Sequence, residues 1–246
     1  TGQRYRHGRI RLAYVSADFR EHPVCYLMAG VFEDHDRDRF ETFGIALRAP
    51  DGSPVAQRAK AAFDRFIDVS AMDDRAAAAL LRAMEIDIAV DLTGYTQGNR
   101  TGIFAYRPAP VQVNYLGFPG TMGISCMDYI VADHFVIPDQ DSRHYTERIV
   151  RLPHCFQAND GRREPIEPGL GRIELGLPET AFIFCAFNNT YKITPPVAGT
   201  WMRLLAAGPD SILWLATDSP PVRRNLSALA ARHGVAPERQ IGRAYV

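Results

Sequence analysis

Short apolar runs and longer amphipathic segments follow one another along the first two thirds of the chain. The apolar runs have the length and composition of strands, and they cover residues 10–15, 40–47, 66–69, 86–92, 111–116, 128–132 and 148–152. Apolar residues recur at helical spacing in segments 24–31, 55–66 and 75–84, and a shorter amphipathic segment surrounds Phe104. Strands that alternate with helices predict an α/β fold with parallel sheets built from βαβ units.

Between residues 157 and 178 this pattern stops, and Gly, Pro, Arg and Glu dominate, which predicts a linker. Further strands are predicted at 182–187 and 211–216. Helices are predicted at 195–207, with Thr194 as N-cap, and at 221–233, with Gly234 as the C-terminal cap. We therefore expect an N-terminal tail (1–8), a first lobe (9–156), a linker (157–178) and a second lobe (179–246) with two strands and two helices.

Composition narrows the class of protein. The 28 basic residues balance the 28 acidic residues, so no broad surface for nucleic acid is expected. No apolar run approaches the length of a membrane span, and the chain does not start with a signal-peptide pattern. The four cysteines stand alone in apolar segments without a C-x-x-C pair. We expect buried free thiols, no zinc site and a cytoplasmic protein without membrane or nucleic-acid partners.

The polar turn 16–23 follows the first strand and precedes the first helix. It contains Asp18, Arg20, Glu21 and His22, and it lies at the carboxyl end of a strand, where open α/β sheets bind ligands. His22 precedes Pro23, which favours an extended or turn conformation. An imidazole titrates near neutral pH and can act as base or acid. Position alone leaves two interpretations of His22 open: a catalytic group, or a loop residue that caps the next helix.

Lys192 lies between a predicted strand and a helix that starts with proline. A helix N-terminus offers free N–H groups and a positive dipole end, so this position suits a phosphate. The alternative is an ordinary exposed lysine, which is the commoner case.

Two further loops follow predicted strands, at residues 94–98 and 117–121. Glycine in these loops permits close approach to a ligand, and Thr96 and Thr121 supply hydroxyl donors, although an ordinary βα turn uses the same residue types. Asp91 is late in a buried strand, where it can orient a neighbour, act as a base or cap the next loop.

Several enzyme classes lack their signatures here. The sequence contains no G-x-G-x-x-G, G-x-x-x-x-G-K-[ST], G-x-S-x-G or H-E-x-x-H motif. This argues against the usual dinucleotide, P-loop and hydrolase families.

Six stretches of the chain together resemble the O-linked N-acetylglucosamine (O-GlcNAc) transferase family, which includes bacterial homologues and the plant SPINDLY-type proteins. They occur in that family's order and spacing from about Arg9 to about Gln240, and they read RIRLAYVSADFREHP, AVDLTGYTQGNR, FAYRPAPVQVNYLGFPGTMG, MDYIVAD, CAFNNTYKITP and PDSILWL.

The resemblance implies a glycosyltransferase B-type architecture, with two Rossmann-like lobes and a nucleotide sugar between them. It also implies inverting transfer of N-acetylglucosamine from UDP-GlcNAc to Ser or Thr hydroxyls of an acceptor protein. No metal and no cofactor beyond the donor are expected. A helical-repeat (TPR-like) domain that presents the acceptor is expected upstream in the intact protein.

By the same resemblance, His22 matches the family's active-site histidine, as a base or a group that orients the donor. Lys192 matches the lysine that neutralises the leaving diphosphate, where negative charge develops as the glycosidic bond breaks. The other expected contacts to substrate are made by Asp91, Thr96, Pro119, Gly120, Thr121, Asn189 and Tyr191.

The resemblance also leaves alternatives. The family continues with a segment that holds the uridine and diphosphate, so we expect this chain to be a catalytic region cut short at its C-terminal end. The SPINDLY branch is associated with GDP-fucose, and a protein O-fucosyltransferase is therefore one alternative. A catalytically silent binding or scaffold domain is the other.

Overall fold

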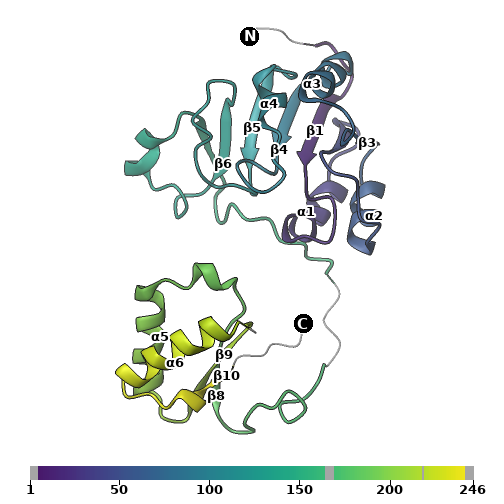
Figure 1. Cartoon of the computed structure of the whole chain (residues 1–246). Coiled ribbons are helices and arrows are strands. Elements are labelled where there is room, and N and C mark those ends of the chain that lie inside the picture. The colour runs from purple at the N-terminus through teal and green to yellow at the C-terminus, as the bar shows by residue number, and fades with distance from the viewer. Residues whose placement is uncertain (1–4, 164–168, 218, 242–246) are drawn as a thin grey trace. The chain divides into compact units, whose positions relative to one another are not determined.

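The computed structural model describes residues 5–163, 169–217 and 219–241, with side chains through residue 239. The chain forms two compact units, residues 1–164 and 165–246 (Figure 1). Their boundary falls inside the predicted linker 157–178.

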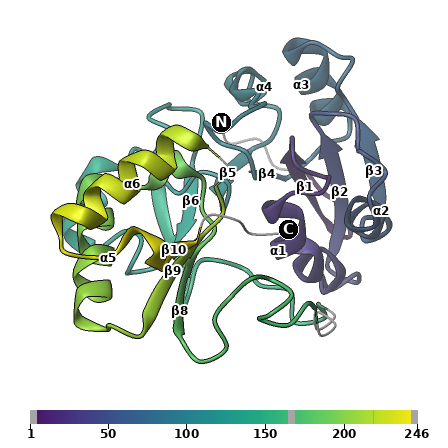
Figure 2. The same ribbon diagram turned by 60° about the horizontal axis from the view of Figure 1, so that its bottom comes forward.

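The first unit contains a seven-stranded parallel sheet in the order β3-β2-β1-β4-β5-β6-β7, and Figure 2 shows β3 to β6 in this sequence. The strands are β1 (Ile10–Ser16), β2 (Phe40–Ala46), β3 (Arg65–Asp68), β4 (Ile88–Asp91), β5 (Val111–Tyr115), β6 (Tyr129–Ala132) and β7 (Arg148–Arg151). The helices are α1 (Pro23–Glu33), α2 (Pro54–Ala61), α3 (Asp74–Ala83), α4 (Thr101–Ala105) and the 3-10 turn η1 (Asp139–His144). The strand order reverses at β1, which places β1 and β4 side by side at the topological switch point.

Helices cover both faces of this sheet because successive strand residues point to opposite sides. Ala13 and Val15 of β1 pack with buried residues of α3 and α4. Leu12 and Tyr14 pack on the other face with α1 and α2, where Phe32 and Phe63 have ring centroids 4.7 Å apart. The predicted α/β fold with a parallel sheet is confirmed.

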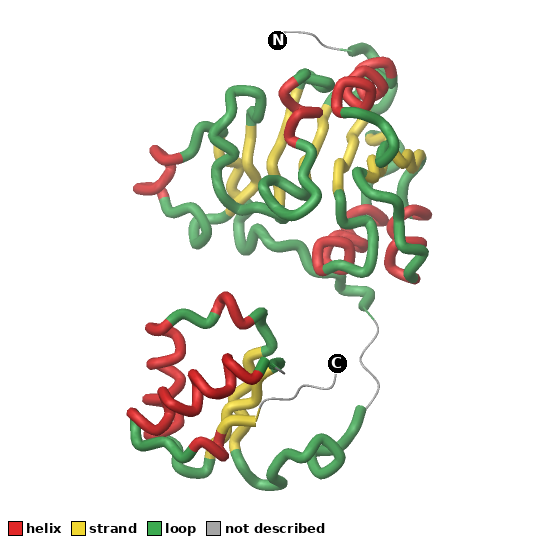
Figure 3. Tube along the Cα trace, viewed as in Figure 1, coloured by secondary structure: helices red, strands yellow, loops and turns green. Residues whose placement is uncertain are grey.

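The second unit begins with β8 (Phe182–Ala186) and continues through η2 (Thr190–Lys192), α5 (Pro195–Ala207), β9 (Ser211–Leu215), α6 (Pro220–Arg232), η3 (Pro237–Arg239) and β10 (Gln240–Ile241). Its parallel sheet has the order β10-β9-β8. Leu213 and Leu215 share one buried cluster with Met202 of α5 and Leu226 of α6. Both helices therefore lie on the same side of the strands (Figure 3).

Some expected details differ. The second unit has a third strand, β10, because two residues without an apolar run can still pair with β9. Thr194 occupies the N-cap of α5, but its side chain makes no capping bond. Gly234 follows the C-cap of α6 with φ of 68°, as expected of a terminating glycine.

All four cysteines are free, as expected, but the prediction that they are buried is wrong for two of them. Cys25 is buried and Cys126 is half-buried. Cys155 is exposed in the segment after β7, and Cys185 is exposed on β8, an edge strand whose neighbouring residues Phe184 and Ala186 pack toward the helices.

Candidate functional site

The carboxyl ends of β1, β4 and β5 gather the first unit's predicted site residues. These strands are neighbours, so the loops that follow them, residues 17–22, 92–100 and 116–121, meet at one edge of the sheet. The Ala17 N–H donates to the Thr93 hydroxyl at 3.0 Å, which joins the first loop to the second. Thr93 is not among the residues predicted from the sequence, because this contact joins residues 76 positions apart.

His22 is the N-cap of α1, with the extended backbone (φ −151°, ψ 145°) that the following Pro23 requires. Its Nδ1 atom accepts the Val24 N–H at 3.3 Å. The capping interpretation of His22 is therefore present in the structure. Capping leaves Nε2 uncommitted among the described residues, and 32% of the side chain is exposed.

Asp18 lies beside this imidazole and is almost fully buried. One of its carboxylate oxygens is 3.6 Å from His22 Nδ1, and the other accepts the Arg20 Nε–H at 3.3 Å. Burial lowers the pKa of His22, Asp18 acts in the opposite direction, and Arg20 adds to the lowering. Because Nδ1 accepts from Val24, the neutral ring carries its proton on Nε2. In this state Nε2 is a hydrogen-bond donor.

Asp91 ends β4 and is buried. Its Oδ1 atom accepts the N–H groups of Thr93 (2.8 Å) and Gly94 (3.0 Å). Burial raises the pKa of this carboxyl, while the two backbone donors oppose the shift. Of the three interpretations left open for Asp91, capping of the loop is the one whose contacts the structure contains. Thr96, five residues after Asp91, is half-buried, and its hydroxyl donates to the Thr93 carbonyl at 2.7 Å.

The loops after β4 and β5 interlock. A Cβ atom on Gly117 would lie 2.0 Å from the Leu92 carbonyl oxygen, and one on Gly94 would lie 2.4 Å from Phe118 Cβ. Both positions therefore require glycine. Leu116 just before has φ of 65°, which is strained for a side chain of this size. Pro119 is exposed, and Gly120 and Thr121 are half-buried.

Two polar residues that sequence analysis missed hold this loop. Asn114 is fully buried, and Nδ2 donates to the carbonyl oxygens of Phe118 and Gly120. Glu147 is also buried, and it accepts the Thr121 hydroxyl and the Met122 N–H. A polar residue inside an apolar strand was a visible signal for Asn114, whereas nothing near Glu147 indicated its role.

The second unit holds the other predicted residues between β8 and α5. Lys192 ends η2, is exposed, and has its ammonium 6.0 Å from the Tyr191 ring centroid. Tyr191 is 79% exposed. Asn189 is also exposed, and its carbonyl accepts the Lys192 N–H at 3.0 Å. No carboxylate lies within salt-bridge distance of Lys192 among the residues that the structure describes.

The start of α5 offers less to a phosphate than the sequence argument assumed. Pro195 and Pro196 have no N–H, and the Thr194 and Ala198 N–H groups donate to carbonyls. Val197 is left as the one uncommitted N–H of the first turn within the described part of the chain. The charge of Lys192 must therefore supply most of any attraction for an anion.

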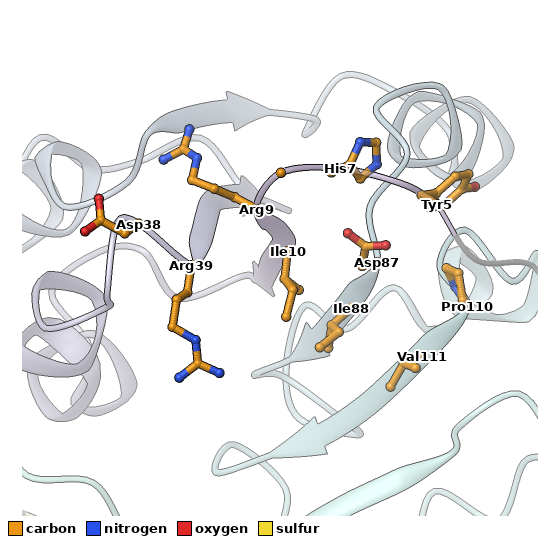
Figure 4. Close-up of a pocket in the computed structure, with 11 residues that line it drawn as sticks. Tyr5, His7, Arg9, Ile10, Asp38, Arg39, Asp87, Ile88, Pro110 and Val111 are labelled. Atoms are coloured by element: carbon orange, nitrogen blue, oxygen red, sulfur yellow. The ribbon is translucent and has the colours of Figure 1, made fainter.

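The opposite edge of the first unit carries a separate pocket of about 470 Å³ (Figure 4). Its floor is formed by Ile10, Ile88 and Val111, the first residues of β1, β4 and β5. None of the predicted site residues lines it. Across the described residues, no group of His, Cys, Asp and Glu side chains is arranged to hold a metal ion, and no helix there is long and apolar enough to cross a membrane.

Comparison with known proteins agrees with the family that the motifs suggested. The model of glycosyl transferase family 41 matches residues 2–165 and 169–244. A protein of Arabidopsis thaliana named probable UDP-N-acetylglucosamine–peptide N-acetylglucosaminyltransferase SEC is 42% identical over 238 residues, which cover 95% of this chain and 24% of that protein. The SPINDLY protein of the same plant is 34% identical over 210 residues, covering 83% of this chain and 22% of that protein.

Among solved structures, an O-GlcNAc transferase mutant of Thermobaculum terrenum aligns with a TM-score of 0.84 and 34% identity. The alignment covers 96% of this chain and 44% of that one. A Listeria monocytogenes protein described as a putative UDP-N-acetylglucosamine 2-epimerase, 12% identical with a TM-score of 0.51, shares the fold. The predicted glycosyltransferase B-type fold is confirmed. The chain spans about a quarter of the length of the curated relatives it matches, and it belongs to glycosyl transferase family 41.

Proposed function

We propose that this chain is part of a protein O-GlcNAc transferase, which transfers N-acetylglucosamine from UDP-GlcNAc to Ser or Thr hydroxyls of an acceptor protein. The observation that carries the proposal is the 42% identity, over 95% of this chain, to a plant relative whose name states this reaction. The SPINDLY relatives carry the same name, so the comparisons give no support to fucosyl transfer. A helical-repeat domain that presents the acceptor is part of the same proposal.

Within this proposal, Lys192 neutralises the diphosphate that leaves as the glycosidic bond breaks. The lysine has no competing carboxylate among the described residues, so its charge is available to a ligand. Asn189 and Tyr191 lie next to it in the chain and contact the donor. Charge stabilisation of a leaving group is among the largest single contributions to catalysis, and it requires no metal when a lysine supplies it.

His22 would act on the donor or acceptor through Nε2, the ring atom that capping leaves uncommitted. In the neutral ring this atom carries the proton, so His22 donates a hydrogen bond to an oxygen of the bound sugar. Thr96, Pro119, Gly120 and Thr121 line the sugar and acceptor side. Asp91 supports the loop that carries Thr96, since its Oδ1 atom accepts the Thr93 and Gly94 N–H groups.

Calorimetric titration of the chain tests the proposal. UDP-GlcNAc and GDP-fucose are titrated separately, each with 5 mM EDTA and again with magnesium. Binding of UDP-GlcNAc that is unchanged by EDTA, and at least roughly tenfold tighter than binding of GDP-fucose, supports the proposal. Preference for GDP-fucose would favour the fucosyl alternative, and binding of neither nucleotide sugar would favour a scaffold domain. Lys192→Ala should weaken binding of UDP-GlcNAc and leave the fold intact, because it removes one exposed charge from the proposed diphosphate site.

A further inference from the structure

Two buried side chains from outside the 117–121 loop, Asn114 and Glu147, hold this loop in place. The loop starts from a strained residue, since Leu116 has φ of 65°. A left-handed conformation of this kind is unfavourable in a non-glycine residue and persists only where the surrounding structure holds it.

Asn114 holds the loop at Phe118 and Gly120. Both hydrogens of its Nδ2 atom are used on loop carbonyls, those of Phe118 at 3.0 Å and Gly120 at 3.1 Å. Its Oδ1 atom is buried and has no hydrogen-bond partner among the residues that the structure describes. A buried oxygen without a hydrogen bond lowers the stability of the fold. The Asn114 side chain bears this cost while its amide nitrogen holds the loop.

Glu147 holds the end of the loop, at Thr121 and Met122. Its buried carboxylate accepts the Met122 N–H at 2.6 Å and the hydroxyls of Thr121 (2.7 Å) and Thr146 (3.2 Å). No Arg or Lys pairs with it among the described residues. A buried charge that is compensated only by neutral donors depends on the placement of each donor.

These contacts fix the direction of one peptide group. The Gly120 carbonyl faces inward to Asn114, and all peptide bonds here are trans. In a trans peptide the C=O and N–H groups point in opposite directions. The Thr121 N–H therefore points away from Asn114, and it has no acceptor among the described residues.

We propose that Asn114 and Glu147 are positioning residues that set the 117–121 loop so that the Thr121 N–H meets an oxygen of the bound nucleotide sugar. This inference rests on the proposed function for the identity of the ligand. It does not rest on that function for the conformation of the loop. Neither residue contacts the ligand, and each acts through the backbone that it holds.

Gln112 provides a matched control on the same strand. It too is fully buried and donates both Nε2 hydrogens to carbonyl oxygens (Phe104 at 3.0 Å and Cys126 at 2.6 Å). Its Oε1 atom likewise has no hydrogen-bond partner within the described part of the chain. Its partners lie outside the 117–121 loop. Gln112→Leu and Asn114→Leu therefore remove equivalent bonds, and only the second removes support from the loop.

The test measures backbone hydrogen exchange of residues 117–122 and calorimetric affinity for UDP-GlcNAc in the full 246-residue chain. We expect Asn114→Leu to speed exchange of the Gly117 and Met122 amides at least tenfold beyond Gln112→Leu, at equal global stability. The dissociation constant should rise about tenfold, the equivalent of one lost hydrogen bond near 1.4 kcal/mol. Glu147→Leu should act likewise, and Glu147→Gln, which keeps one acceptor oxygen, should restore part of the affinity.

Equal exchange and equal affinity in Asn114→Leu and Gln112→Leu would overturn the inference. If the parent chain does not bind UDP-GlcNAc, the proposed function fails. The exchange comparison then still decides whether these side chains position the loop. If only the affinity is unchanged while exchange rises, the Thr121 N–H does not serve the nucleotide sugar and the inference is wrong.

Discussion

Replacement of His22 separates its role as a helix cap from its role in transfer. His22→Ala removes the acceptor of the Val24 N–H, whereas His22→Asn keeps a side-chain acceptor at the N-cap, where asparagine is among the preferred residues. Both variants remove the imidazole. A difference between them in stability therefore reports capping, and a loss that they share in activity reports the imidazole.

The expected magnitude follows from the geometry of the cap. Loss of an N-cap side chain costs about 0.5–2 kcal/mol. The bond to Val24 is 3.3 Å long, at the weak end for an N–H donor, so we expect about 1 kcal/mol for His22→Ala. This corresponds to a fall of roughly 2–4 °C in Tm for a chain of this size. His22→Asn should stay within about 0.3 kcal/mol of the parent.

The stability of the parent chain and that of His22→Asn should also depend differently on pH. Burial lowers the pKa of His22 in the folded chain, against the opposing carboxylate of Asp18. Between that lowered pKa and the unfolded value near 6.5, the unfolded chain binds more protons, so the free energy of unfolding falls as pH decreases through this window. The pKa of His35 is also lowered by burial and contributes with the same sign. Because the parent and His22→Asn both contain His35, the contribution of His35 drops out when the two proteins are compared.

Thermal and urea unfolding of the three proteins at pH 7.5 and 5.5, followed by circular dichroism, measures both effects. The parent should lose more stability than His22→Asn on going to pH 5.5. The reasoning is refuted if His22→Asn is as unstable as His22→Ala at pH 7.5, or if parent and His22→Asn respond equally to acid. Transfer retained in His22→Asn would show that the residue is a cap alone.

Three further outcomes are expected. Lys192→Ala should leave Tm unchanged within 1–2 °C, roughly, because the residue is exposed, and it should reduce transfer at least about 100-fold; equal turnover by a sugar-transfer assay would contradict the assignment. Asp91→Asn keeps the oxygen that both loop amides use, so it should fold and retain most activity, whereas Asp91→Ala should lose about 2 kcal/mol in urea unfolding. Because burial raises the pKa of Asp91, its favourable contribution to the free energy of unfolding is present at low pH and is lost as pH rises through the pKa of the folded state. Asp91→Asn should not show this loss of stability. Arg58→Ala removes the guanidinium that contacts the buried Asp160 carboxylate at 2.5 Å, and it should cost about 3 kcal/mol at pH 7. Because Arg58 lowers the pKa of Asp160, this cost should shrink in an acid unfolding series as pH falls and the Asp160 carboxylate is protonated.

Local signals in the sequence were sufficient for most elements. The segment 75–84, predicted as a helix, forms most of α3, and Asp73 caps this helix by accepting the Ala76 N–H. The segment 55–66 was expected to be one helix, yet α2 ends at Ala61. Phe63 and Phe66 instead pack against Phe19 in an aromatic cluster between helix and sheet. Apolar spacing alone does not distinguish these two ways of burying a ring.

The candidate site was predictable only where its residues are close in sequence. The capping role of His22 and the turn made by Asp91 involve partners two or three residues away. Glu147 lies just before β7 and supports a loop 25 residues earlier in the chain, after β5, and β6 separates these two strands in the sheet. A contact of this kind depends on the order of strands in the sheet, which hydrophobic patterning does not specify.

The closely packed glycines imply that the loops after β4 and β5 can move only together. Gly117 lies against the Leu92 backbone, and Gly94 lies against Phe118, so neither loop has room to shift alone. An engineer who seeks a different donor or acceptor by grafting a longer segment at either place must exchange both segments together. The same constraint predicts that substitutions tolerated during divergence arrive here in pairs.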